Sequence, residues 1–154
     1  IFRPTDPSAI VNEIRLRAGF DRYQAAMNEG DRLFSHATAE ARLAVRTDDD
    51  QSTEYAMLAE AEQRFLIARR EAEGFGEDQR AQIRLLDVYY AWARALYLDG
   101  TNEWYRRNDR AVLENAREVA ERGLALPNIT GGQRGRMTEL KTRIDRAITP
   151  WPIL

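Results

Sequence analysis

The chain has 154 residues, with 23 basic side chains, 25 acidic side chains and no cysteine. One domain of ordinary size is expected, and a disulfide scaffold, a cysteine nucleophile and a cysteine-ligated metal are excluded. The net charge of −2 disfavours a general nucleic-acid binder, whose surface is usually basic. No apolar run approaches the roughly 18 residues of a membrane span. We expect membrane association only through a missing anchor or a complex.

The composition favours helix over strand. Alanine, the best helix former, occurs 22 times, whereas valine and isoleucine together occur 14 times. No segment alternates between apolar and polar residues as a half-buried strand does. The sequence therefore predicts an all-α fold with about six helices.

The first half of the chain contains three predicted helices. The first spans about 8–28 and begins after Asp6-Pro7, a plausible N-cap followed by a favourable first helical residue. Gly30 is expected to interrupt the pattern, so a second helix spans about 31–46. A third spans about 52–73, after an acidic loop that suits the positive N-terminus of a helix.

The fourth predicted helix, about 77–98, is apolar on most of its circumference. One narrow line along it is charged. Such a helix is usually packed between neighbours, so we expect it to be the central helix of the fold. The charged line consists of Arg80, Arg84, Asp87 and Arg94.

Two further helices and a tail complete the chain. The fifth helix spans about 109–126 and is ended by Pro127. The sixth spans about 132–148, and Thr130 with Gln133 has the spacing of a capping box. Residues 149–154 contain two prolines and are expected to form an extended tail.

A repeated pattern of small and large residues indicates two helical hairpins. The pattern of the third helix recurs in the fifth at an offset of 55 residues. We therefore expect one domain, 1–148, in which hairpins 31–73 and 77–126 are flanked by capping helices 8–28 and 132–148. The pattern consists of Ala61, Phe65 and Ala68 in the third helix and of Ala116, Ala120 and Gly123 in the fifth.

These positions resemble the tetratricopeptide repeat (TPR) family. Tyr89, Trp92-Ala93 and Leu96 look like the first helix of such a repeat, and Ala61, Phe65 and Ala68 look like the second. The resemblance implies an α-solenoid whose groove is lined by the first helix of each hairpin, here 31–46 and 77–98. The alternative is an irregular helical bundle, in which the same spacing reflects packing alone.

The sequence offers no positive support for catalysis, a metal or a cofactor. His36 is the only histidine, and neither a phosphate-binding loop nor a Glu-x-x-His pair is present. The acidic run at 48–50 lacks the ligand spacing of a calcium loop. A Gly- and Arg-rich helix start at 131–136 is more simply read as a helix entry than as an anion site. We therefore expect a protein that is not an enzyme.

Aromatic and arginine side chains cluster around the fourth predicted helix and the loop after it. These residue types are enriched where proteins bind one another. We expect a scaffold that binds a partner protein or peptide; the alternative is a structural subunit of a larger complex, such as one of the cell envelope. The candidate partner-binding residues are Arg84, Asp87, Tyr90, Arg94, Trp104, Tyr105, Arg107 and Trp151.

Overall fold

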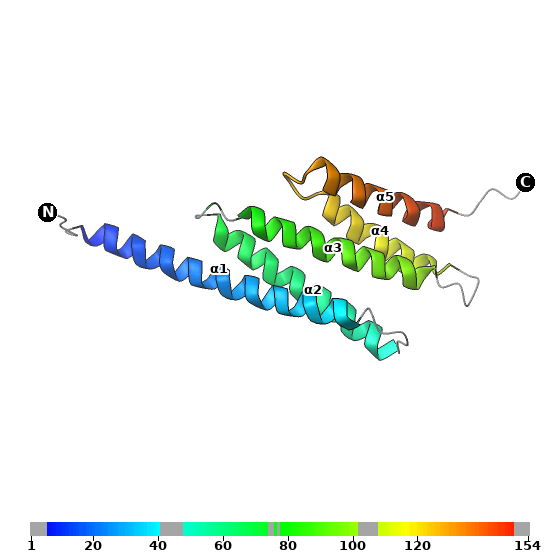
Figure 1. Cartoon of the computed structure of the whole chain (residues 1–154), viewed down its shortest axis with the longest axis horizontal. Helices are drawn as coiled ribbons and strands as arrows, with labels where there is room; N and C mark the ends of the chain where they lie inside the picture. Colours follow the sequence, from blue (N-terminus) through cyan, green and yellow to red (C-terminus); the bar gives the residue numbers. More distant parts are fainter. Residues whose placement is uncertain (1–5, 41–47, 74–75, 77, 102–107, 150–154) are drawn as a thin grey trace, which may run out of the picture.

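The computed structural model describes residues 6–40, 48–73, 76, 78–101 and 108–149. Within these ranges the fold is all-α, as predicted, and contains no strand. Each helix packs against the next one along the chain in an elongated array (Figure 1). The helices are α1 (Pro7–Glu40), α2 (Asp48–Ala72), α3 (Asp78–Gly100), α4 (Arg110–Leu124) and α5 (Gly131–Ile148).

Helix α1 continues through Gly30, where the sequence predicts a break between helices 8–28 and 31–46. That boundary is wrong, and the described residues form five helices rather than six. Gly30 serves helix packing instead. A Cβ atom at this position would lie 2.6 Å from Cε1 of Phe65, a fully buried side chain on α2. The missing side chain therefore lets α1 and α2 approach closely.

Small side chains of the predicted repeat lie in the core. On α2 and α4 they leave room for the neighbouring helices, because a helix surface without bulk permits a short distance between axes. Their spacing follows the buried stripe of each helix. The side chains without exposed surface include Ala61 and Ala68 on α2, Ala93 on α3, and Ala116 and Ala120 on α4.

Helix α3 is the central helix, as its largely apolar circumference predicts. It packs against α2 and α4 and also touches α1 and α5. Gly123 of α4 is one point of close packing: a Cβ atom there would lie 2.6 Å from Cε of Met137 and 3.3 Å from Cβ of Tyr89. Helices α3, α4 and α5 thus meet around one glycine. The arc of α3 that these neighbours leave uncovered faces solvent.

A buried polar cluster joins α2, α3 and α4. Glu62 of α2 is only 7% exposed, and its carboxylate lies 3.4 Å from the Arg122 guanidinium of α4. The hydroxyl of Tyr89 on α3 donates a hydrogen bond to the same carboxylate. Burial, together with this bond, raises the pKa of Tyr89. A buried carboxylate is costly without such partners, so the cluster favours this one arrangement of the three helices.

The N-termini of α4 and α5 are both capped, and the cap of α5 is the capping box that the sequence predicts. The Asp109 carboxylate accepts a hydrogen bond from the Val112 backbone N–H at 3.3 Å. Thr130 and Gln133 form a reciprocal capping box, with hydrogen bonds of 3.2 and 3.0 Å. Helix α2 begins at Asp48 rather than near residue 52, so the acidic run belongs to its first turn.

Gly30→Ala tests the close approach of α1 and α2. The added Cβ meets the buried Phe65 ring, so we expect the free energy of unfolding to fall by about 1–3 kcal/mol. Gly135→Ala on α5 is the matched control, because nothing lies within 4 Å of its added Cβ and alanine is the better helix former. Urea denaturation compares the two variants. Equal stability of the two would contradict this packing.

Tyr89→Phe tests the polar cluster through its alkaline pH dependence. The unfolded chain releases the phenolic proton near the ordinary pKa of 10.0, whereas the folded chain holds it to higher pH. The stabilisation is therefore complete below that pKa and is lost as the pH rises above it. At neutral pH we expect Tyr89→Phe to be less stable than the natural chain by about 1 kcal/mol. Urea denaturation at neutral and alkaline pH measures this gap, which should narrow above pH 10.0; a constant gap contradicts the prediction.

Candidate functional site

Helices α1, α3 and α5 enclose a groove on one face of the molecule. Helix α3 forms the floor, and α1 and α5 lie on either side of it. A cavity of about 360 Å³ opens into the groove. Its lining consists of Phe34 from α1, Leu86, Asp87, Tyr90 and Ala91 from α3, and Gln133, Arg136 and Met137 from α5.

The uncovered arc of α3 extends the groove beyond the cavity. Positions 83, 87, 90, 94 and 98 follow one another at three- or four-residue spacing and therefore share a face. Ile83 and Leu98 are exposed large hydrophobic side chains at the two ends of this face. The exposed Arg94 guanidinium between them has no ion-pair partner in the described part of the chain. The floor thus offers apolar surface and a positive charge together.

An ion-pair network connects α3 to α1 along the groove. Nε of Arg84 lies 3.1 Å from Oδ1 of Asp31 on α1, and its guanidinium also reaches Asp87 at 3.8 Å. All three side chains are nearly half exposed, so solvent weakens their attraction. The network therefore contributes little to stability, and its charges are accessible to a ligand.

Tyr90 and Arg136 form a cation–π contact between α3 and α5. The Arg136 guanidinium lies 4.1 Å from the centre of the Tyr90 ring. Such contacts contribute about 0.5–1 kcal/mol at exposed sites. An aromatic ring and an arginine are therefore held together at the edge of the cavity, and both types commonly anchor protein partners.

Asp87 lies in the groove with a shifted pKa. Burial raises its pKa above the ordinary 3.8, and this outweighs the opposing attraction of Arg84 and Arg136. The nearby Asp31 carboxylate also raises it. The folded chain therefore holds the charged form of Asp87 at a small cost, which a cationic or hydrogen-bond-donating ligand would relieve.

Arginines of α5 continue along the same side of the molecule. A second hollow of about 520 Å³ lies where α3 and α5 end, between Tyr97, Arg143 and Arg146. Asn108 closes it by donating a hydrogen bond to the Ala147 carbonyl at 3.0 Å. Arg143 is paired with Glu139 at 2.9 Å, and Arg146 is exposed. The α5 side of the groove is therefore positively charged.

A third hollow, of about 560 Å³, lies on the side of α2 and α4 and has a different character. Arg69 and Arg122 line it, yet both are engaged by partners within the fold. Arg69 donates a hydrogen bond to Gln82 at 3.0 Å, and Gln82 in turn donates to the Pro127 carbonyl. Arg122 pairs with the buried Glu62. These polar groups hold the helices together, so the α1–α3–α5 groove is the better candidate site.

The structure brings half of the predicted site residues to this groove. Arg84, Asp87 and Tyr90 lie beside one another, and Arg94 lies on the same face of α3. The other four predicted residues, Trp104, Tyr105, Arg107 and Trp151, lie outside the described ranges, as do residues 150–154 of the predicted tail.

Sequence reasoning missed the contribution of α5. Gln133, Arg136 and Met137 line the cavity, but the Gly- and Arg-rich start of this helix gives no indication that it lies beside α3. Phe34 belongs to a predicted groove helix but is not among the predicted site residues. The only sequence signal for this role of α5 is the spacing of its arginines, which predicts a charged face on the helix. That spacing does not indicate which helix the face lies beside.

Comparisons with known protein families, curated proteins and solved structures find no match to this chain. Within the described ranges, none of the helices is both long enough and apolar enough to cross a bilayer. The same ranges contain no group of three or more histidine, aspartate or glutamate side chains arranged to hold a metal ion.

Asp87→Asn tests the electrostatics of the groove. Because the pKa of Asp87 is raised in the folded chain, its ionisation destabilises the fold above the ordinary pKa of 3.8 and not below it. We expect the variant to match or slightly exceed the natural chain in stability near neutral pH, with the gain vanishing as the pH falls through 3.8. Thermal denaturation across this pH range measures the effect. A marked loss of stability at neutral pH contradicts the prediction.

Proposed function

We propose that this chain is a non-enzymatic α-helical scaffold that binds a partner protein or peptide in the α1–α3–α5 groove. We further propose that its helices pair as in a TPR-like solenoid. The layering supports this arrangement: α3 touches both α1 and α5, while α2 and α4 are linked by the Glu62–Arg122 ion pair. Odd-numbered helices thus form one layer and even-numbered helices the other, and the odd layer carries the groove.

The buried repeat residues also support the solenoid. The second helix of each TPR-like hairpin, α2 or α4, carries small residues at equivalent places, and these are buried in both. Phe65 of α2 fills the space beside Gly30, and the matching place in α4 is occupied by Ala120. The two hairpins therefore share a packing scheme with different side-chain volumes.

The proposed mode of binding combines an apolar anchor with ionic contacts. An apolar side chain of the partner enters the cavity beside Phe34 and Met137. Carboxylates of the partner pair with Arg94 and Arg146, which have no ion-pair partner in the described ranges. An extended segment or a helix satisfies both requirements, since grooves of this kind accept either.

One observation carries the proposal: the floor of the groove exposes apolar and cationic side chains that the described part of the fold does not use. Ile83 is 38% exposed and Leu98 is 52% exposed, and Arg94 lies between them without an ion-pair partner in the same ranges. On the α2–α4 side, by contrast, the arginines of the hollow are engaged by the fold. Unused groups gathered on one concave face are typical of a binding surface.

Affinity capture from the source cells tests the proposal. The baits are the natural chain, a Tyr90→Ala/Arg94→Glu double variant of the groove, and Arg70→Glu as a matched charge reversal on exposed α2 surface. We expect the natural chain and Arg70→Glu to recover the same partner, and the groove variant to recover at least about ten-fold less. Circular dichroism confirms that all three baits are folded. Equal recovery with the groove variant contradicts the proposal.

A further inference from the structure

The N-terminal part of α1 extends past the other helices. Arg22 pairs with Glu71 at 3.1 Å, next to the last residue of α2, so α2 does not reach the residues that precede this pair. We term Pro7–Ala18 the α1 extension; at 1.5 Å per residue it is about 18 Å long. It projects beyond the array of helices in Figure 1. All of its side chains are exposed except that of Ala18, which is half-buried.

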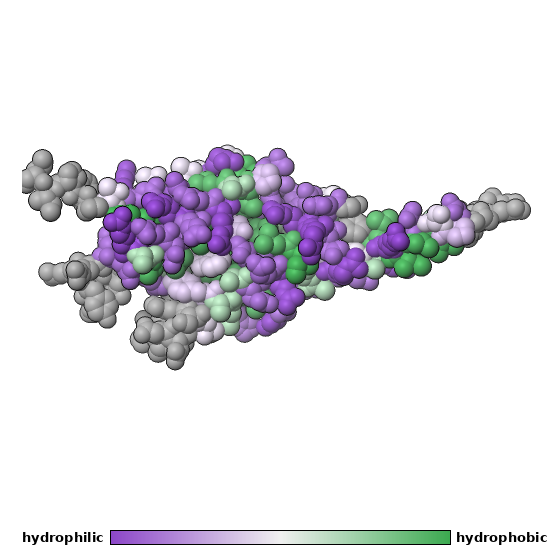
Figure 2. Space-filling model, turned by 180° about the vertical axis from the view of Figure 1, so that it is seen from behind, coloured by the Kyte–Doolittle hydropathy of each residue, from purple (hydrophilic) through white to green (hydrophobic). Residues whose placement is uncertain are grey.

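This part of α1 is apolar although it is exposed. Five of the seven exposed large hydrophobic side chains in the described ranges lie in or next to the extension. Figure 2 shows hydrophobic surface, in green, on the projecting end of the molecule. Such a concentration of apolar surface is typical of an interaction site. The five are Ile10, Val11, Ile14, Leu16 and Phe20.

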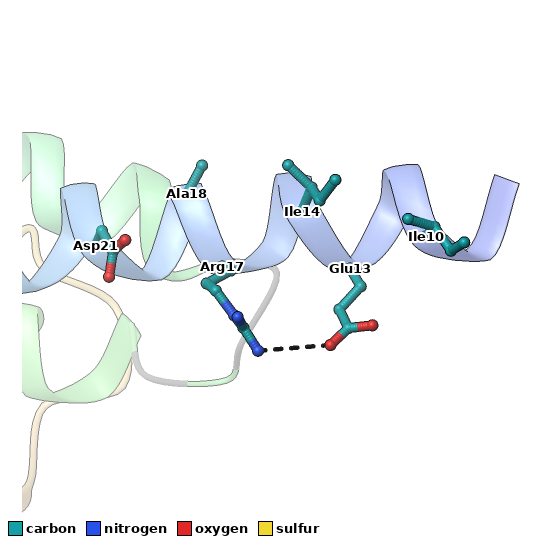
Figure 3. A pocket seen from close by; sticks show the side chains of 6 residues that line it. All are labelled: Ile10, Glu13, Ile14, Arg17, Ala18 and Asp21. Carbon is teal, nitrogen blue, oxygen red and sulfur yellow. Dashed lines mark ion pairs between the residues drawn. The ribbon is translucent and has the colours of Figure 1, made fainter. Parts of the chain in front are cut away.

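One face of the extension has the pattern of a helix-pairing seam. Ile10, Ile14 and Ala18 follow one another at four-residue spacing, so they form a stripe on one side of the helix. Glu13 and Arg17 lie along one edge of the stripe, with their charged atoms 3.6 Å apart. The described residues that line the shallow cavity of about 440 Å³ on this face all belong to α1 (Figure 3).

We propose that the α1 extension is a self-association surface, on which the extension of a second copy of this chain packs antiparallel, with the twofold axis near Ile14. Reversal of one copy places Ile10 against Ala18 of the other and the two Ile14 side chains against each other. It also brings each Glu13 carboxylate close to an Arg17 guanidinium of the second copy. The stripe and its charged edge are thus complementary to themselves, as an isologous interface requires.

The charged groups along the edge of the stripe indicate that the partner of this surface is a second copy of the chain. A polyanionic partner would favour a basic edge, whereas this edge alternates in sign at four-residue spacing, with Glu13, Arg17 and Asp21. In the antiparallel pair, the Glu13 carboxylate of each copy therefore faces the Arg17 guanidinium of the other copy. The pairing involves only a few helical turns, which puts its buried area below about 1,200 Å². We therefore expect a dimer that dissociates on dilution.

The absence of cysteine from the chain allows a direct test by disulfide cross-linking. In an antiparallel pair, only a residue at the twofold axis lies against the same residue of the second chain. Ile14→Cys should therefore form a covalent dimer under mild oxidation, whereas Ser35→Cys, exposed on the same helix, should not. A mixture of Ile10→Cys and Ala18→Cys should form the mixed dimer. Cross-linking of Ser35→Cys as efficient as that of Ile14→Cys overturns the proposal.

Sedimentation equilibrium provides the second test. We expect the natural chain to dimerise reversibly and Ile14→Glu to raise the dissociation constant by about 100-fold or more, since each dimer loses two buried isoleucines. Ile14 is 63% exposed, so the variant should keep its helix content and melting temperature. The proposal is overturned if the natural chain is monomeric at every accessible concentration. Binding of the extension of such a monomer to lipid vesicles or to another protein would not rescue the proposal.

Discussion

The closeness with which neighbouring helices approach one another determines the rest of this structure. Gly30 leaves room for the Phe65 ring between α1 and α2, and Gly123 leaves room for Met137 between α4 and α5. Alanines without exposed surface have the same role along α2 and α4. Because close helices bury large side chains against small ones, the order and spacing of the helices follow from a few positions.

The groove is a consequence of this packing. With α2 and α4 packed close to α3, and α1 and α5 only touching it, one arc of α3 remains uncovered. The buried cluster around Glu62 holds α2, α3 and α4 in register from the other side. The charges of the uncovered arc are therefore held in place by the packed helices while remaining accessible to solvent. The proposed binding surface therefore needs little reorganisation when a partner binds.

Local features of the fold were predictable from the sequence, whereas features that depend on a distant partner were not. The helical class, the caps at Asp109 and Thr130, and the shared face of Asp87 and Tyr90 all follow from residues within a few positions of one another. A glycine such as Gly30 either ends a helix or admits a neighbour, and only Phe65, far along the chain, decides which. The place of Arg136 beside Tyr90 has the same origin.

The most direct measurement is site-specific photo-cross-linking in the cells of origin. A photoreactive amino acid replaces Arg94 on the groove floor in one strain and Asn115, exposed on α4, in another. If the α1–α3–α5 groove is the binding surface, the probe at position 94 forms a covalent adduct with a partner protein and the probe at position 115 does not. An adduct from position 115 alone would contradict the central claim, because it would place the partner on the layer of α2 and α4.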